Sequence, residues 1–134
     1  MPMMTDIHWE NFNADTDTVV TPEVKNFDGF TAPEKQQVTV EGDGRTTVIY
    51  RYTRNVHTLT LKNYDGKTDK TVEARYEMSI PKPTRAGYAF AGWYTDAKCT
   101  KEYKANMPDQ DLTLYAKWEA NIVNYVVEHY QQNV

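Results

Sequence analysis

Few residues in this chain of 134 could act as a nucleophile. Ser79 is the only serine, and the sequence around it, EMSIPKP, lacks the glycines that place a catalytic serine on a sharp strand-to-helix turn. The single cysteine, Cys99, has no neighbouring histidine and no helix start that would lower its pKa. We therefore expect no catalytic residue and no enzymatic activity, with Ser79 structural or solvated and Cys99 a surface-loop thiol.

The histidines and the acidic residues do not form a metal-binding pattern. His8, His57 and His129 lie far apart and belong to no HExxH motif, so each is expected at a strand position with its ring nitrogen satisfied. Oxygen ligands alternate at Asn13, Asp15 and Asp17 as at the start of an EF-hand loop, but the loop's sixth and twelfth positions hold threonine and valine instead of glycine and glutamate. We expect no metal and no cofactor, and we interpret this acidic cluster as a turn or a helix cap.

Other polar clusters have a structural explanation as well. Asp109 and Asp111 are predicted to be turn and cap residues, and Gly42, Asp43 and Gly44 are predicted to form a hairpin turn, because no phosphate-cradling signature surrounds them.

Four aromatic residues in the second half of the chain allow two interpretations. Trp93, Tyr94, Tyr103 and Trp118 could form a stacking surface for a sugar or a peptide, because aromatic faces supply rigid contact area. A module this small also needs large side chains for its core, and we favour this role for Trp93 and Trp118. No ligand-binding residue is assigned from the sequence.

The elements that would position these residues are strands. Alternation predicts a hairpin over residues 38–52, a second hairpin over residues 56–76 with its turn at Asp65 and Gly66, and strands at 112–118 and 121–131. Helical patterns are limited to single turns near residues 18–25 and 107–111. We expect an α+β fold strongly dominated by β-structure, with little helix.

The composition agrees with a β-rich chain that does not depend on electrostatic attraction to a partner. Tyrosine, phenylalanine and tryptophan make up 13% of the residues, which favours pleated, half-buried surfaces. The net charge of −4 argues against a nucleic-acid or anionic-membrane binder. No apolar run is long enough to insert into a membrane, and one cysteine excludes an internal disulfide.

An imperfect internal repeat divides the chain. TPEVKNFDGFTAP and IPKPTRAGYAF both lead into a glycine followed by an aromatic residue, at Gly29 and Gly87, and both are followed by a tyrosine-bearing strand, TVIYRYTRN or LTLYAKWEAN. The second copy carries an insertion within residues 92–103. Both glycines are expected to need a positive φ.

The repeat predicts three segments: a module over residues 1–54 that lacks its opening strand unless IHWENFN supplies it, a complete module over residues 55–119, and an orphan opening strand over residues 120–134. We expect residues 121–130 to complete the first module by strand addition, within the chain or in a neighbouring copy, which would make a strand-exchanged oligomer. No flexible linker separates the modules.

The second module resembles a known family. PTRAGYAFAGWY, at residues 83–94, and LTLYAKW, at residues 112–118, are similar to the Listeria-Bacteroides repeat, or internalin B-repeat, of bacterial surface proteins. Residues 16–53 resemble the mucin-binding-protein type of module, and NYVVEHYQQNV resembles the start of another. This resemblance implies small β-grasp-like (ubiquitin-like) folds, extracellular display in wall-attached proteins, and a role as a stalk or spacer between adjacent repeat modules with adhesive contacts. The alternative it implies is a module that binds a host glycan or protein through exposed aromatics.

Overall fold

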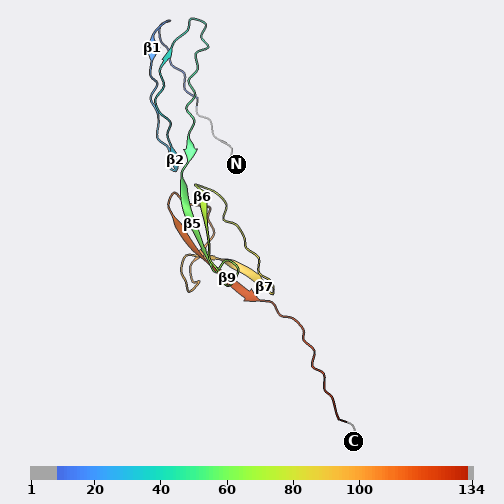
Figure 1. The fold of residues 1–134 in the computed structure, drawn as a ribbon. Helices are drawn as coiled ribbons and strands as arrows, with labels where there is room; N and C mark the ends of the chain where they lie inside the picture. The colour runs from blue at the N-terminus through green and yellow to red at the C-terminus, as the bar shows by residue number, and fades with distance from the viewer. Residues whose placement is uncertain (1–8, 133–134) are drawn as a thin grey trace. The chain divides into compact units, whose positions relative to one another are not determined.

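The structure is a computed structural model that describes residues 9–132. The chain divides into two compact units, residues 1–53 (unit 1) and residues 54–134 (unit 2). Figure 1 shows the strands of both along the chain. The module boundaries predicted from the repeat stay a prediction.

Unit 2 is built on one five-stranded mixed sheet. Its strands lie in the order β6-β5-β9-β7-β8, and of the neighbouring pairs only β5 and β9 run parallel. Their bounds are β5 Val56–Lys62, β6 Lys70–Arg75, β7 Tyr88–Tyr94, β8 Glu102–Tyr103 and β9 Leu112–Ala120. The predicted hairpin over residues 56–76 and the predicted strand at 112–118 are confirmed, because in both cases alternation matches the period of a half-buried strand.

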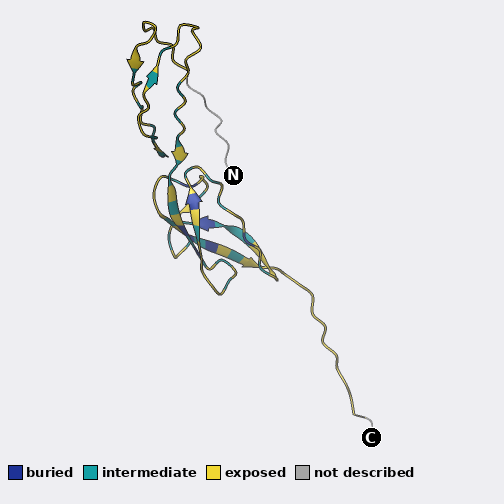
Figure 2. Ribbon diagram, turned by 45° about the horizontal axis from the view of Figure 1, so that its top comes forward, coloured by how far each residue is buried: buried dark blue, intermediate teal, exposed yellow. Residues whose placement is uncertain are grey.

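One face of this sheet holds the hydrophobic core. Figure 2 shows that the buried positions lie in unit 2, on the strands of the sheet. Leu59 and Leu61 of β5 and Leu114 of β9 are fully buried, and the polar residues between them face the other side. Two irregular segments cover the core face and are tied to each other through Met107, whose N–H donates to the carbonyl of Met78 at 2.8 Å. Unit 2 therefore has a core made from a single sheet and two extended segments.

Unit 1 contains two pairs of very short strands. β1, Val19–Val20, pairs with β3, Val38–Thr39, and β2, Phe30–Thr31, pairs with β4, Thr53–Arg54. The prediction of a hairpin over residues 38–52 is wrong, because β3 pairs with the earlier strand β1 and not with a later one. β3 pairs with β1 because the backbone groups of Val40 are bonded to those of Asp17 and Thr18, at 2.7 and 2.8 Å.

Unit 1 has almost no interior. Among its described residues, 9–53, only Gly29 is buried. Its tyrosines are held at their hydroxyl ends instead: Tyr50 donates to the carbonyl of Pro22 at 2.7 Å, and Tyr52 donates to that of Lys25 at 2.6 Å. Edge contacts and hydrogen bonds hold this unit together, and no cluster of buried side chains supports it.

No helix forms within residues 9–132, so the helical part of the expected α+β fold is wrong for the described chain, and the structure there is all-β. The turn expected over residues 18–25 is interrupted by β1 and by Pro22, which disfavours helical geometry in the residue before it. The turn expected over residues 107–111 fails because the backbone of Met107 is already bonded to Glu77 and Met78.

The two glycines of the internal repeat adopt the same conformation. Gly29 has φ of 82° and Gly87 has φ of 81°, as expected from the sequence. In each case the following aromatic N–H donates at 3.1 Å to the carbonyl three residues earlier, from Phe30 to Phe27 and from Tyr88 to Arg85. The repeat is therefore a repeat of backbone geometry as well as of sequence.

Replacing Gly87 with valine should destabilise unit 2 by about 1–3 kcal/mol, because a β-branched residue is strained at positive φ. A Cβ at this position would meet open space, so the whole cost is in the backbone. Gly87→Asn, which tolerates this conformation, is the matched control and should cost less. Thermal unfolding measures both variants, and equal losses would contradict the backbone explanation.

The turn between β5 and β6 should make the stability of unit 2 sensitive to acid. The Asp65 carboxylate accepts hydrogen bonds from the N–H groups of Thr68 and Lys67 and from the Thr68 hydroxyl, and these hold its pKa at about 2, below the ordinary 3.8. Because the pKa is lower in the folded state, the stabilisation is present above pH 3.8 and is lost as the pH falls toward about 2.

We expect Asp65→Asn to flatten the fall in melting temperature over this pH window. Hydrogen bonds also lower the pKa values of Asp69 and Asp96, so part of the acid sensitivity should remain in the variant. A melting temperature series in acid, with the exposed Asp43→Asn as control, checks this result. An unchanged pH profile in Asp65→Asn would contradict it.

Residues 121–132 form no strand in this chain. The backbone N–H of Asn121 donates to the carbonyl of Gly87 at 2.9 Å, and every residue from 121 to 132 is exposed. The strand predicted there is not formed by the single chain, and its pairing with the first module stays a prediction.

Candidate functional site

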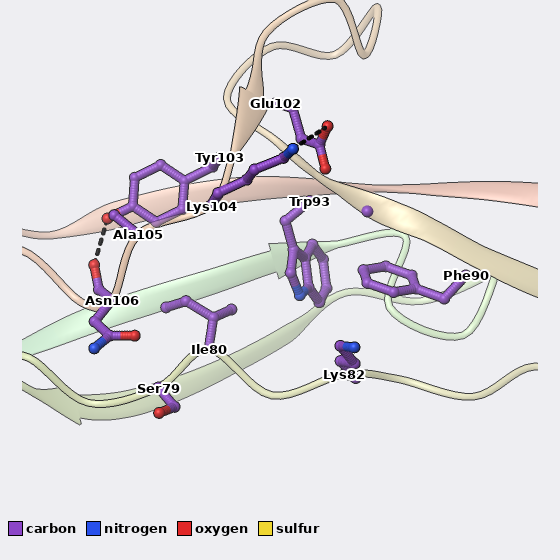
Figure 3. Close-up of a pocket in the computed structure, with 11 residues that line it drawn as sticks. Ser79, Ile80, Lys82, Phe90, Trp93, Glu102, Tyr103, Lys104, Ala105 and Asn106 are labelled. Atoms are coloured by element: carbon purple, nitrogen blue, oxygen red, sulfur yellow. Dashed lines mark hydrogen bonds and ion pairs between the residues drawn. The ribbon is translucent and has the colours of Figure 1, made fainter.

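A concave surface lies on unit 2 beside Trp93, and we call it the Trp93 groove (Figure 3). Its volume is about 280 Å³. Three parts of unit 2 form it: the segment between β6 and β7, strand β7, and β8 with the residues after it. The lining residues are Ser79, Ile80, Lys82, Phe90, Gly92, Trp93, Glu102, Tyr103, Lys104, Ala105 and Asn106.

The floor of the Trp93 groove is aromatic. Trp93 is only 5% exposed, and its Nε1–H donates to the carbonyl of Pro81 at 2.8 Å, which fixes the ring against the segment that covers the core. Phe90 packs edge-on against it, with ring centroids 5.1 Å apart. Tyr103 donates its hydroxyl to the carbonyl of Asn106, and burial raises its pKa, so it remains a neutral phenol.

The rim of the groove carries charge. Lys104 lies 3.8 Å from Glu102 in an exposed ion pair, drawn as a dashed line in Figure 3, and Lys82 is exposed on the opposite segment. A pair in this setting is worth little to stability. An apolar floor with polar groups at its edge suits contact with a sugar ring or a peptide side chain.

The groove does not unite the nucleophile candidates. Ser79 lines it, but Cys99 and the described histidines do not. Cys99 lies in the turn between β7 and β8, at φ of 54°, and burial together with the Asp96 carboxylate raises its pKa, so the thiol stays protonated. Cys99 is in a loop, as expected, and Ser79 is exposed.

His57, Asp109 and Asp111 serve local structure. His57 Nε2 lies 2.7 Å from an Asp109 oxygen, and the N–H of Thr58 donates to Asp111 at 2.8 Å, so both carboxylates hold the start of β5. His129 is exposed in residues 121–132, and His8 lies outside the described residues. Within residues 9–132 no cluster of three metal-ligating side chains occurs.

The N-terminal acidic cluster is a turn, as the sequence indicated. The N–H of Thr18 donates to the carbonyl of Asp15 at 3.2 Å, and Asp17 has a positive φ of 69°. At the other predicted turn, the N–H of Arg45 donates to Asp43 at 2.9 Å.

The four aromatics of the predicted stacking surface are divided between roles. Trp93 is a core residue, as we favoured, and Trp118 is partly buried against the core with its Nε1–H bonded to the carbonyl of Asn63 at 2.9 Å. Tyr94 has Lys117 above its ring at 5.6 Å. Only Trp93 and Tyr103 line the groove, so no continuous four-ring surface exists.

Arg85, which the candidate residues of the sequence did not include, organises several contacts of unit 2. Its guanidinium lies 3.5 Å from the centroid of the Tyr88 ring and 5.8 Å from that of Trp118. It also occupies the space beside Gly66, where a Cβ would approach it to 2.3 Å. Arg85 thus packs between the β5–β6 turn and the ends of β7 and β9. The signal for it was present in the PTRAGY motif.

Comparison with known proteins agrees with the motif in unit 2. Residues 57–117 match the family model described as the Listeria-Bacteroides repeat domain. Residues 57–117 carry a Listeria-Bacteroides repeat domain. The match covers the whole five-stranded sheet except the first residue of β5 and the last three of β9. This repeat is typical of bacterial surface proteins.

Two proteins of Evansella cellulosilytica are similar to the chain that carries this repeat domain. One, named only as a membrane protein, is 34% identical over 80 residues, which is 56% of this chain and 12% of that protein. The other, named as a Gly-rich membrane protein, is 33% identical over 89 residues, which is 63% of this chain and 10% of that protein. The chain therefore spans only a small fraction of these relatives. No helix in residues 9–132 has the length and apolar character needed to cross a bilayer.

Proposed function

We propose that this chain is a spacer segment of a bacterial cell-surface protein, displayed outside the cell and wall-attached through its parent protein. The repeat domain at residues 57–117 and relatives named as membrane proteins support this proposal. The observation that carries it is the short connection between the units: Asn55 alone separates the end of β4 from the start of β5. A junction with so few free dihedrals restricts bending, which a stalk requires.

The strand order supports the β-grasp assignment for unit 2. Taken in chain order, its first and fifth strands, β5 and β9, are parallel neighbours; β6 pairs antiparallel with β5 on one side, and β7 followed by β8 continues the sheet antiparallel on the other. The mucin-binding type of module before it rests on the sequence resemblance of residues 16–53.

Spin-label distances test the spacer role. With Cys99 replaced by serine, labels at the exposed positions Gln37→Cys and Lys98→Cys should give a narrow distance distribution if the one-residue connection leaves the units little freedom to bend. A short Gly-Ser insertion after Asn55 should broaden the distribution. A distribution that is already broad without the insertion would overturn the proposal.

The Trp93 groove favours one second candidate, a binding module for a host glycan or protein. Trp93 and Tyr103 form its floor, and Lys82 and Lys104 provide hydrogen-bond donors at its rim. Screening on a glycan array, with tryptophan fluorescence to follow binding, tests this function. Lys104→Ala should then weaken binding while Lys98→Ala, exposed outside the groove, should not.

A further inference from the structure

The chain enters and leaves the five-stranded sheet of unit 2 through neighbouring strands. It enters at Val56, the start of β5, and it leaves at Ala120, the end of β9. These two strands lie side by side and run parallel. In a parallel pair, the start of one strand and the end of its neighbour lie at opposite ends of the ladder. A tension along the chain therefore pulls β5 and β9 past each other along their length.

This sliding loads the hydrogen bonds of the pair together. The register joins four residue pairs, from Leu59 with Leu112 to Lys62 with Tyr115. Because the strands must slide instead of peel, all of these pairs are strained at once and their resistances add. In an antiparallel pair the same tension would act at one end, and the pairs would open one at a time. The direction of β5 relative to β9 thus makes the sheet resist extension.

The boundary between β5 and β9 is the one that tension must break. In the sheet β6 neighbours β5 and can move with it, while β7 and β8 continue the sheet from β9 and can move with that strand. The β5–β9 register has four pairs, whereas β5 with β6 and β7 with β9 each have six. The load path therefore crosses the sheet at its shorter ladder.

Side chains reinforce this boundary at the end where the chain enters. Asp111, just before β9, accepts a hydrogen bond from the N–H of Thr58 in β5 at 2.8 Å. Asp109 accepts one from the side chain of Asn55 at 3.0 Å, and His57 Nε2 lies 2.7 Å from the same oxygen. Hydrogen bonds to a carboxylate are stronger than those between neutral groups. They hold β5 at the point where tension first reaches it.

Another bond ties the opposite end of the boundary. The Nε1–H of Trp118 in β9 donates to the carbonyl of Asn63, the residue after β5, at 2.9 Å. Trp118 lies beyond Tyr115, the last β9 residue in register with β5, so this bond extends the contact past the end of the ladder. Side chains therefore hold the short β5–β9 ladder at both of its ends.

We propose that unit 2 is a load-bearing element, in which the parallel β5–β9 pair and its side-chain bonds form a clamp that resists extension of the chain. The use of this β5–β9 clamp rests on the proposed spacer function, but its resistance belongs to unit 2 itself. A narrow spin-label distribution with a weak clamp would overturn this inference alone. A broad distribution with a strong clamp would overturn only the rigid spacer.

Pulling on single molecules of the full chain in two geometries tests the clamp. With Cys99 replaced by serine, one handle is attached at Arg51→Cys and the second at either Ile122→Cys or Gln110→Cys, all exposed positions. The Ile122 handle makes β5 and β9 slide, whereas the Gln110 handle loads both strands at the same end, so that the four pairs open in turn. We expect a severalfold higher unfolding force in the sliding geometry. Equal forces, or a lower force in the sliding geometry, overturn the proposal.

Two aspartates separate mechanical from thermal stability. Asp111→Ala removes a carboxylate bond within the clamp, and Asp69→Ala removes a carboxylate bond of 2.9 Å to the N–H of Asn63 within the β5–β6 hairpin. Both variants should lower the melting temperature, but only Asp111→Ala should lower the unfolding force in the sliding geometry. Trp118→Phe, which keeps an aromatic ring but loses the indole N–H, should lower this force as well. Equal forces in the two aspartate variants would overturn the role of the side-chain bonds in the clamp.

Discussion

Trp93→Ala is expected to abolish the cooperative thermal unfolding of unit 2. The ring is 5% exposed, contacts Phe90 edge-on and is bonded to the Pro81 carbonyl, so its removal leaves a cavity and an unpaired acceptor. Truncation of a buried tryptophan costs about 3–5 kcal/mol. A domain at the low end of the usual range has only about 5 kcal/mol of net stability. Unit 2 has one small core, so this loss could unfold it.

Tyr94→Ala is the matched control, because Tyr94 is the next residue of the same strand and lies outside the hydrophobic core. It should unfold cooperatively with a smaller loss of stability. Calorimetry and near-ultraviolet circular dichroism on the full chain measure both variants. If Trp93→Ala unfolds cooperatively like the parent chain but loses a glycan or protein ligand, Trp93 serves the ligand and the core assignment is wrong.

The sequence was most informative where alternation and burial coincide. In β5 the alternating leucines face a core that unit 2 itself provides, so local pattern and tertiary packing agree. The same holds for β9 and for the turn at Gly87, where only a residue that tolerates positive φ fits. Each of these features is fixed by residues close together in the chain.

Alternation of apolar residues did not predict strand pairing where the partner strand is distant in sequence. Val38 and Val40 alternate as a hairpin strand should, yet β3 pairs with β1, because the backbone of Val40 is bonded to Asp17 and Thr18. Alternation gives the faces of a strand and does not identify its neighbour. The missing core of unit 1 adds to this, since no buried face there selects one register over another.

Some residues of the Trp93 groove could be predicted from the sequence, but the shape of the groove could not. Trp93 and Tyr103 were singled out as aromatics, but the Trp93 groove also needs the segment around Ser79 and Lys82, which covers the core without regular structure. Its path depends on the backbone hydrogen bonds that Met107 makes with Glu77 and Met78, which are far from it in sequence. Arg85 was visible in a motif, while its position over Tyr88 depends on how the β5–β6 turn meets β7.

Leu114→Ala should destabilise unit 2 by about 2–5 kcal/mol, the usual cost of truncating a buried leucine to alanine. Leu114 is fully buried in β9, the strand that joins β5 to β7, and it lies in register with Leu61 of the parallel neighbour. A cavity there removes packing contacts from the core cluster that Leu114 shares with Leu59, Leu61 and Trp93. Thr113→Ala, one residue earlier and exposed, should change the melting temperature little. Chemical denaturation of the two variants measures the difference, and a Leu114→Ala chain as stable as Thr113→Ala would show that unit 2 is not held by this single core.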